Sequence, residues 1–301
     1  HTRLLTVTGV QTCALPISPD VVVVGHVTRD LVTSVPSGFT FGGTATFASV
    51  AAHRLGHRVG LVTACAAEPA IGGALAGIDL VVARAQVTTT FENHYTSTGR
   101  VQYVRAAAPP IASTSIPERW RDAPVALLGP VAQELRRDVV HAFCEQTTVT
   151  ATLQGWVRTW DEVSGRVRPV DWDDYEAFLD RIDAVVFSPV DVGSDPALVQ
   201  RYAERARLAV VTEASDGGVV WHQGARFRYP AYDVEEVEPT GAGDAFAIAF
   251  AIEFHATGDP EHSARYASCV ASFVVEGHGT SRVPTIDAVR ERFRHGRLRS
   301  S

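Results

Sequence analysis

The chain of 301 residues contains no lysine, and all 27 of its basic residues are arginine. This absence excludes several chemistries. A P-loop site needs its lysine on the phosphates, the protein-kinase fold needs a strand lysine, and pyridoxal-phosphate and other Schiff-base enzymes need an amine. A bound phosphate would therefore have to be held by backbone N–H groups, by arginine or by a metal ion.

Methionine is also absent, so the sequence has no initiator residue, and we expect a fragment or an open-ended translation. Residues 1–18 contain neither the long apolar core nor the small-residue cleavage site of a signal peptide. They resemble translated sequencing-adapter read-through. We interpret 1–18 as a non-native leader and expect one domain over 19–301.

Cysteine and excess positive charge are scarce. The four cysteines are scattered, with no CxxC pair: Cys13, Cys65, Cys144 and Cys269. This usage predicts thiols in a reducing cytoplasm. The net charge of -7 disfavours a nucleic-acid partner, because no basic excess is available to neutralise phosphates. The apolar runs are too short to span a bilayer, so we expect no membrane partner.

Short apolar runs rich in β-branched residues alternate with segments of helical periodicity. The predicted strands are Val21–Gly25, Val59–Val62, Val125–Gly129, Val149–Leu153, Ala184–Ser188 and Leu208–Thr212. The predicted helices cover about 43–56, 131–144, 172–181, 195–206, 243–256, 260–275 and 285–294. Strand–helix alternation of this kind predicts an α/β fold with a mostly parallel sheet covered on both faces.

Residues 27–41 and 87–106 interrupt this rhythm with alternating polar and apolar residues, and Thr98-Gly99 indicates a hairpin turn. We expect a small antiparallel β lid over a ligand cleft. The alternative is a surface hairpin without function. Glu92 and Asn93 are neighbours on one predicted strand, so at most one of them faces a ligand directly.

The segment Thr240–Asp244 carries the strongest chemical signal. Gly241, Ala242 and Gly243 are small and stand where an apolar helix begins, so backbone N–H groups there predict an anion hole. Asp244 would be repelled by a bound phosphate unless it acts as a base that accepts the proton of an attacking hydroxyl. The alternative is a glycine turn with an acidic residue favoured by the helix dipole.

The TGAGDAF run resembles the C-terminal signature of the ribokinase-like (PfkB) carbohydrate and nucleoside kinases, and the resemblance extends over residues 20–295. It implies a Rossmann-like three-layer core with a β lid, and phosphoryl transfer from ATP to a sugar or similar alcohol. The family's catalytic base corresponds to Asp244, and its anion hole to Gly241, Ala242 and Gly243. The family's lid sheets often pair between protomers, which would make this chain a homodimer.

The resemblance also implies an acceptor site. Asp30 follows the first strand, as does the family's residue that binds substrate hydroxyls, and Gly42-Gly43 resembles the di-glycine segment that packs against the sugar. We add Asn93 of the lid as a substrate residue. Most sugar kinases have an asparagine where this chain has Phe47, and the run GGTATF is similar to the branch that includes myo-inositol kinases.

On the nucleotide side, Thr212 and Gly217 fit the family's T-x-G-x-x-G segment, in which Ala214 replaces one glycine. Ser268 stands where the family often has an asparagine beside the adenine. Asp191 retains a carboxylate suited to Mg²⁺. The implied cofactors are thus ATP and Mg²⁺, with K⁺ added because Glu238 stands near the cation site of some members.

Two alternatives remain open at this point. Ser188 stands where the family has an asparagine, and the departures at Phe47, Ser188 and Ala214 suit a non-catalytic sensor of polyol or nucleotide. Phe47 could instead stack on the ring of a vitamin-type aromatic alcohol, which would make the protein a related kinase of different substrate class. Arg158 follows a buried strand at its carboxyl end, where it either meets a phosphate or lies on the surface.

Overall fold

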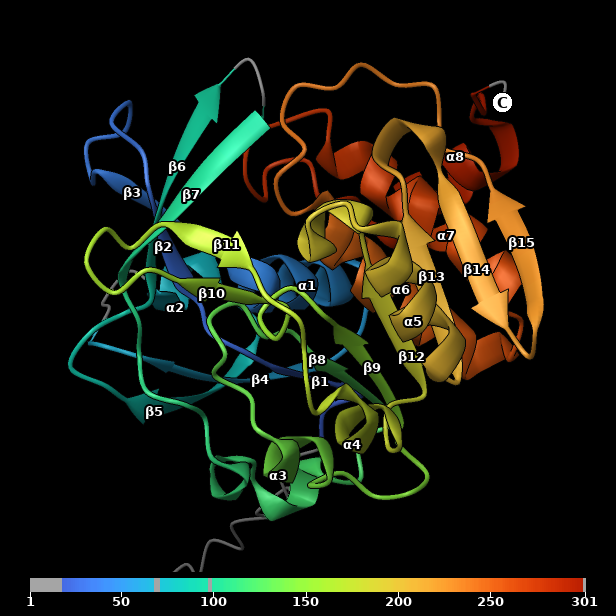
Figure 1. Ribbon diagram of the computed structural model, residues 1–301. Coiled ribbons are helices and arrows are strands. Elements are labelled where there is room, and N and C mark those ends of the chain that lie inside the picture. The colour runs from blue at the N-terminus through green and yellow to red at the C-terminus, as the bar shows by residue number, and fades with distance from the viewer. Residues whose placement is uncertain (1–17, 68–70, 97–98, 300–301) are drawn as a thin grey trace, which may run out of the picture.

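The computed structural model describes residues 18–67, 71–96 and 99–299, and a nine-stranded sheet runs through its centre (Figure 1). Residues 1–17 of the interpreted leader lie outside the described residues. The sheet order is β15-β14-β13-β12-β9-β8-β1-β4-β5. Its strands are β1 (Val21–Val24), β4 (Val59–Cys65), β5 (Asp79–Arg84), β8 (Val125–Leu128), β9 (Thr148–Thr152), β12 (Ala184–Phe187), β13 (Leu208–Thr212), β14 (Gly218–His222) and β15 (Ala225–Tyr229).

Pairing in this sheet is parallel from β5 to β13, and only the β13–β14 and β14–β15 pairs are antiparallel. The mostly parallel sheet is therefore confirmed. The antiparallel hairpin at its end was not predicted, because glycines 217 and 218 indicate a turn without showing that β14 and β15 extend the sheet.

Helices cover both faces of the sheet because successive strand residues point to opposite sides. Val21 and Val23 pack into one apolar cluster with α1, α6, α7 and α8, whereas Val22 and Val24 pack into a second with α3, α4 and α5. The helices are α1 (Gly43–Arg54), α2 (Ile71–Ala74), α3 (Arg137–Val140), α4 (Tyr175–Leu179), α5 (Pro196–Arg205), α6 (Ala242–Thr257), α7 (Pro260–Val274) and α8 (Ile286–His295), with short 3₁₀ turns at Ser113–Ser115, Glu118–Trp120, Pro189–Val192 and Ala214–Asp216. The three-layer α/β core is confirmed.

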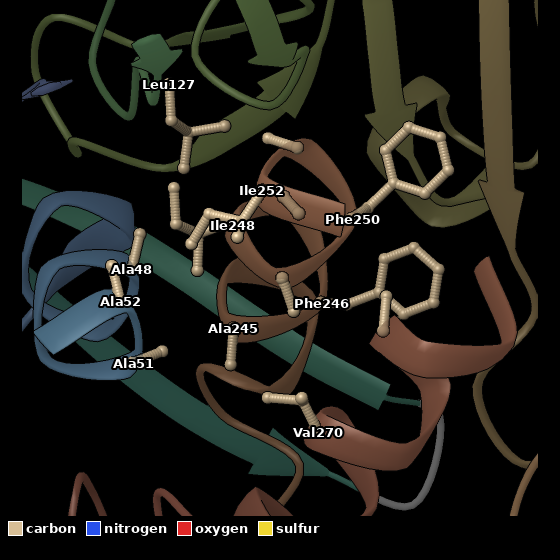
Figure 2. Packing of buried hydrophobic residues seen from close by; sticks show 14 of the residues in the cluster. Ala48, Ala51, Ala52, Leu127, Ala245, Phe246, Ile248, Phe250, Ile252 and Val270 are labelled. Atoms are coloured by element: carbon tan, nitrogen blue, oxygen red, sulfur yellow. The ribbon is translucent and has the colours of Figure 1, made fainter. Parts of the chain in front are cut away.

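Two helices distant in sequence, α1 and α6, pack directly on each other. Figure 2 shows Ala48, Ala51 and Ala52 of α1 beside Ala245 and Ile248 of α6. Small side chains at a helix contact allow a short interaxial distance. This packing places the first turns of both helices side by side.

The lid is a separate four-stranded sheet of order β3-β2-β6-β7 (Figure 1). Its strands are β2 (Thr28–Leu31), β3 (Phe39–Gly42), β6 (Thr90–Thr96) and β7 (Gly99–Ala106). The expected small antiparallel sheet is confirmed, although β2 and β6 pair in parallel. Thr98 of the predicted turn lies outside the described residues. The hairpin β10 (Arg158–Trp160) and β11 (Val167–Pro169) reaches β7, where the Val104 amide donates to the Gly165 carbonyl oxygen at 2.8 Å.

The predicted helix over 131–144 was wrong for most of its length, since α3 covers Arg137–Val140 alone. The cause is Glu134, which is buried and accepts hydrogen bonds from the backbone amides of Val131 and Ala132. Gln133 has a positive φ of 60°. Periodicity detects the apolar face of this segment, but a side chain that satisfies the amides locally competes with helix formation. Over the described ranges, no helix is long and apolar enough to cross a bilayer.

Candidate active site

A pocket of about 530 Å³ lies between the lid and the core. Its wall has two parts. The lid half comprises Asp30, Phe91, Asn93, Gln102 and Arg158, and the hairpin half comprises Thr212, Ala214, Gly217, Tyr232 and Ser268. Of the residues expected from the sequence to form a site, those that line the pocket are Asp30, Gly43, Asn93, Asp191, Thr212, Gly217, Gly241, Ala242, Gly243, Asp244 and Ser268.

The first turn of α6 enters the pocket through a glycine in a left-handed conformation. Gly241 is the N-cap of α6 with φ of 83°, a conformation that favours glycine. A Cβ added to Gly241 would collide with the ring of Phe47. The Ala242 amide donates to the Pro239 carbonyl oxygen at 3.2 Å. The Gly243 and Asp244 amides are among those that helix geometry leaves without an intrahelical acceptor.

The Asp244 side chain is held by the first turn of helix α1. The Thr44 hydroxyl donates to Asp244 Oδ1 at 2.7 Å, and Thr44 itself is only 1% exposed. Thr44 lies in the run GGTATF, and the sequence alone gives no signal for its contact with Asp244. Two segments 200 residues apart therefore build one polar group at the pocket wall.

Asp30 is positioned by its own strand and by a glycine opposite. The Thr28 hydroxyl donates to Asp30 Oδ1 at 3.1 Å. Gly42 faces Thr28 across the β2–β3 pair, and a Cβ at Gly42 would collide with Asp30 Oδ2. Gly42 is not part of the pocket lining. It leaves room for the carboxylate, while Gly43, with φ of 80°, lines the pocket.

Arg158 is part of the pocket wall and not of the surface. It is 6% exposed, and its Nε donates to the Val131 carbonyl oxygen at 2.7 Å. Its Nη1 donates to Gln102 Oε1 at 2.8 Å, and Gln102 Nε2 donates to Asn93 Oδ1 at 2.9 Å. Asn93 lines the pocket and Glu92 does not, as strand alternation predicts.

The hairpin half combines a polar turn with an apolar wall. Thr212 ends β13, and Gly217 has φ of 80° beside Tyr229. Ala214 has φ of 49°, so an alanine adopts a conformation that is easier for glycine. The Ser268 hydroxyl donates to the Pro230 carbonyl oxygen at 3.0 Å. The apolar part of this wall is formed by Tyr232, Val234, Ala271 and Val275.

The carboxylates among the described residues that line the pocket are Asp30, Asp191, Glu236 and Asp244. Asp191 Oδ2 accepts from the Ser188 amide at 2.8 Å, and its Oδ1 lies 3.4 Å from Gln154 Nε2. Glu238 lies outside the pocket lining, and its Oε2 accepts from the Gly279 amide at 3.2 Å. In the part of the chain that the structure describes, no three His, Cys, Asp or Glu side chains gather at a metal-binding distance.

Solved structures with the same fold cover nearly the whole chain. A myo-inositol kinase converted from a pyrophosphate-dependent enzyme superposes with a TM-score of 0.74 at 18% identity, over 91% of this chain and 99% of that one. Ribokinase from Arabidopsis thaliana, complexed with ribose and ATP, gives 0.69 at 19% identity, over 93% and 100%. Residues 184–286 match the pfkB family carbohydrate kinase profile. Residues 184–286 are thus similar to a PfkB-family domain, and the chain has a ribokinase-like fold.

Curated relatives of the PfkB-family domain are kinases. The ATP-dependent ribose-1-phosphate kinase of Halopiger xanaduensis is 35% identical over 83 residues, which is 28% of this chain and 28% of that protein. Inositol 3-kinase of Arabidopsis thaliana is 28% identical over 176 residues, 55% of this chain and 48% of that protein. These matches span less than half the length of the relatives.

The ribokinase-like fold explains one departure from the family pattern. Phe47, where most sugar kinases have asparagine, is 2% exposed and packs its ring beneath Gly241. The ring supports the first turn of α6 and also lines the pocket, and the aromatic-alcohol alternative stays a prediction. This role depends on the approach of α1 to α6, so the sequence around Phe47 gives no signal for it.

Proposed function

We propose that the protein transfers the terminal phosphoryl group of ATP to a hydroxyl group of a sugar, polyol or nucleoside. The observation that carries the proposal is the placement of Asp244 in the first turn of α6, where it lines the pocket and accepts a hydrogen bond from Thr44. The proposed general base, Asp244, then lies beside the backbone amides at the start of α6, in the pocket wall.

In the proposed reaction the acceptor lies against Asp30 and Asn93 in the lid half. Its hydroxyl oxygen attacks the γ-phosphorus, the bond from that phosphorus to the bridging oxygen breaks, and ADP leaves. Asp244 accepts the hydroxyl proton during the attack. The amides of Gly243 and Asp244 stabilise the charge on the transferring group, which suits a chain without lysine.

The hairpin half suits the nucleoside part of an ATP donor better than it suits a pyrophosphate donor. Tyr232 is buried, and with Val234, Ala271 and Val275 it gives the pocket an apolar wall on which the nucleobase of ATP can pack. Burial raises the pKa of the Tyr232 hydroxyl, so this wall stays neutral at physiological pH. A pyrophosphate donor would leave these apolar side chains without a ligand.

The carboxylates of the pocket suit Mg²⁺ in the way that phosphoryl-transfer sites bind it. Mg²⁺ typically takes one or two carboxylates and completes its shell with phosphate oxygens and water. Asp191 lines the pocket and would hold it, with Asp244 beside the same phosphates. When bound, the ion neutralises charge on the phosphate oxygens. The K⁺ dependence drawn from Glu238 and the homodimer through the lid stay predictions.

A donor and acceptor screen on the full chain tests the proposal. Purified protein is incubated with Mg²⁺, either ATP or pyrophosphate, and D-ribose, myo-inositol or adenosine, and products are followed by ³¹P NMR. We expect ADP and a phosphate monoester with ATP, and at least about 100-fold slower formation of both with Asp244→Asn. Calorimetric binding of ATP and acceptor without any product would favour the sensor, and turnover with pyrophosphate alone would contradict the ATP assignment.

A further inference from the structure

A hydrogen-bond chain with a fixed direction crosses the lid half of the pocket. It runs from the Arg158 guanidinium to the Gln102 amide and from there to Asn93. Gln102 and Asn93 stand directly opposite each other on β7 and β6, so their side chains share one face of the lid. All three residues line the pocket.

Arg158 is anchored independently of this chain. Both its Nε and its Nη2 donate to the Val131 carbonyl oxygen, and its guanidinium carbon lies 4.9 Å from the centroid of the Phe91 ring, a cation–π distance. Strand β10 begins at Arg158, so Arg158 comes from outside the lid sheet, whereas Gln102 and Asn93 lie on lid strands β7 and β6. The Arg158 end of the hydrogen-bond chain is therefore fixed in position.

The chemistry of the three groups determines which way each amide faces. An asparagine or glutamine amide has an acceptor at one end and donors at the other, and it can rotate to exchange them. A guanidinium only donates. Gln102 must therefore turn its oxygen to Arg158 and its nitrogen to Asn93. Asn93 must then turn its oxygen to Gln102, which leaves its Nδ2 as the polar atom for a ligand.

We propose that Arg158 is a positioning residue that sets the hydrogen-bonding polarity of Asn93 through Gln102. The lid half would then present one acceptor, the Asp30 carboxylate, and one donor, the Asn93 amide. It would select acceptor substrates that direct a hydroxyl hydrogen to Asp30 and an oxygen lone pair to Asn93. This inference rests on the proposed function, because it assumes that the acceptor occupies the lid half.

Gln102→Glu keeps the shape of the side chain at position 102 but reverses the direction of its hydrogen bond with Asn93. A carboxylate accepts from both neighbours, so Arg158 keeps its partner and gains an ion pair. Asn93 must now donate its Nδ2 to residue 102, and its oxygen turns to the ligand. Glu92→Gln is the matched control, since Glu92 lies on the opposite face of the same strand and pairs with Arg105 and His94.

The first readout needs no turnover. In ¹⁵N-resolved NMR spectra of the ligand-free full chain, we expect slow hydrogen exchange at the Gln102 side-chain amide and fast exchange at that of Asn93. In Gln102→Glu the Asn93 amide should become the protected one. An Asn93 amide that exchanges equally fast in both proteins would overturn the proposed polarity, whether or not the protein proves to be a kinase.

The second readout is kinetic and uses the best acceptor among D-ribose, myo-inositol and adenosine. A donor replaced by an acceptor against a ligand oxygen should raise the acceptor KM about 10-fold or more, with the KM for ATP changed less than about twofold. Arg158→Met should raise the same KM, and Arg158→Lys should restore part of the effect. An acceptor KM for Gln102→Glu equal to that of Glu92→Gln would sink the specificity role.

Discussion

The Thr44 hydroxyl donates to Asp244 Oδ1 at 2.7 Å and joins the first turns of two helices across 200 residues of sequence. Thr44 is buried, and its methyl group packs where a side chain on Gly129 would stand. The donor is therefore fixed by the core, and it holds the carboxylate at the mouth of α6.

Asp244→Asn should keep the fold and lose turnover. The asparagine oxygen can still accept from Thr44, so we expect an unchanged unfolding midpoint. The amide cannot accept the hydroxyl proton, and loss of general-base catalysis should lower kcat by about 10²- to 10⁴-fold. Steady-state kinetics beside thermal unfolding checks this, and kcat within tenfold of wild type would show that Asp244 is not the base.

Thr44→Val removes the donor at nearly constant volume. We expect kcat to fall by about 10-fold, because a hydrogen bond to a charged group is worth about 1.5–3 kcal/mol and its loss releases the carboxylate from one orientation. Thr44→Ser keeps the hydroxyl and should stay within threefold of wild type. Equal kcat values for the valine and serine variants would mean that the Thr44 hydroxyl does not position Asp244.

Two glycines of the same turn should respond differently to alanine. Gly241→Ala introduces a Cβ at φ of 83° against the Phe47 ring, so we expect a loss of about 2 kcal/mol or more in unfolding free energy. Gly243→Ala places its Cβ in open space and should fold normally. Its methyl group narrows the approach of a phosphate to the turn, so its ATP KM should rise. Chemical denaturation and kinetics of both variants decide the matter, and a stable Gly241→Ala would contradict the packing.

Alkaline pH should destabilise the protein through Tyr229. Burial raises the pKa of the Tyr229 hydroxyl, which has no hydrogen-bond partner among the described residues. The unfolded chain therefore loses this proton first, at a pH of about 10. The stability that the neutral form contributes is complete below that pH and is lost as pH rises toward the folded-state pKa.

Tyr229→Phe tests this dependence directly. The variant gives up no hydrogen bond, so we expect equal or greater stability at pH 7. Between pH 10 and 11 the wild type should lose up to about 1.4 kcal/mol per pH unit more than the variant. Burial also raises the pKa of Tyr266, to about 12, and that contribution is common to both proteins. Urea unfolding from pH 8 to 11 measures the difference, and parallel curves would contradict the role of Tyr229.

Asp191→Asn should weaken the response to Mg²⁺ without weakening the fold. An asparagine oxygen can replace Oδ2 as the acceptor for the Ser188 amide. We expect the Mg²⁺ concentration for half-maximal turnover to rise about 10-fold, because a hard cation prefers a charged oxygen ligand. Asp195→Asn, an N-cap of α5 outside the pocket, is the control. Identical Mg²⁺ curves for the two variants would remove Asp191 from the metal site.

The sequence determined the features that depend on neighbours along the chain. Apolar β-branched runs such as Val21–Val24 are long enough to indicate buried strands, and the start of α6 is encoded by Gly241 followed by an apolar helix. Local patterns failed at 131–136, where Glu134 satisfies the backbone amides that a helix would have used.

Only the tertiary structure decided which polar groups meet. Thr44 reaches Asp244 because alanines let α1 approach α6, and Arg158 reaches Asn93 because the lid and the β10 hairpin converge on one pocket. A hydrogen bond between residues far apart in sequence leaves no periodicity in that sequence. Its existence depends on packing distances that many distant side chains set together.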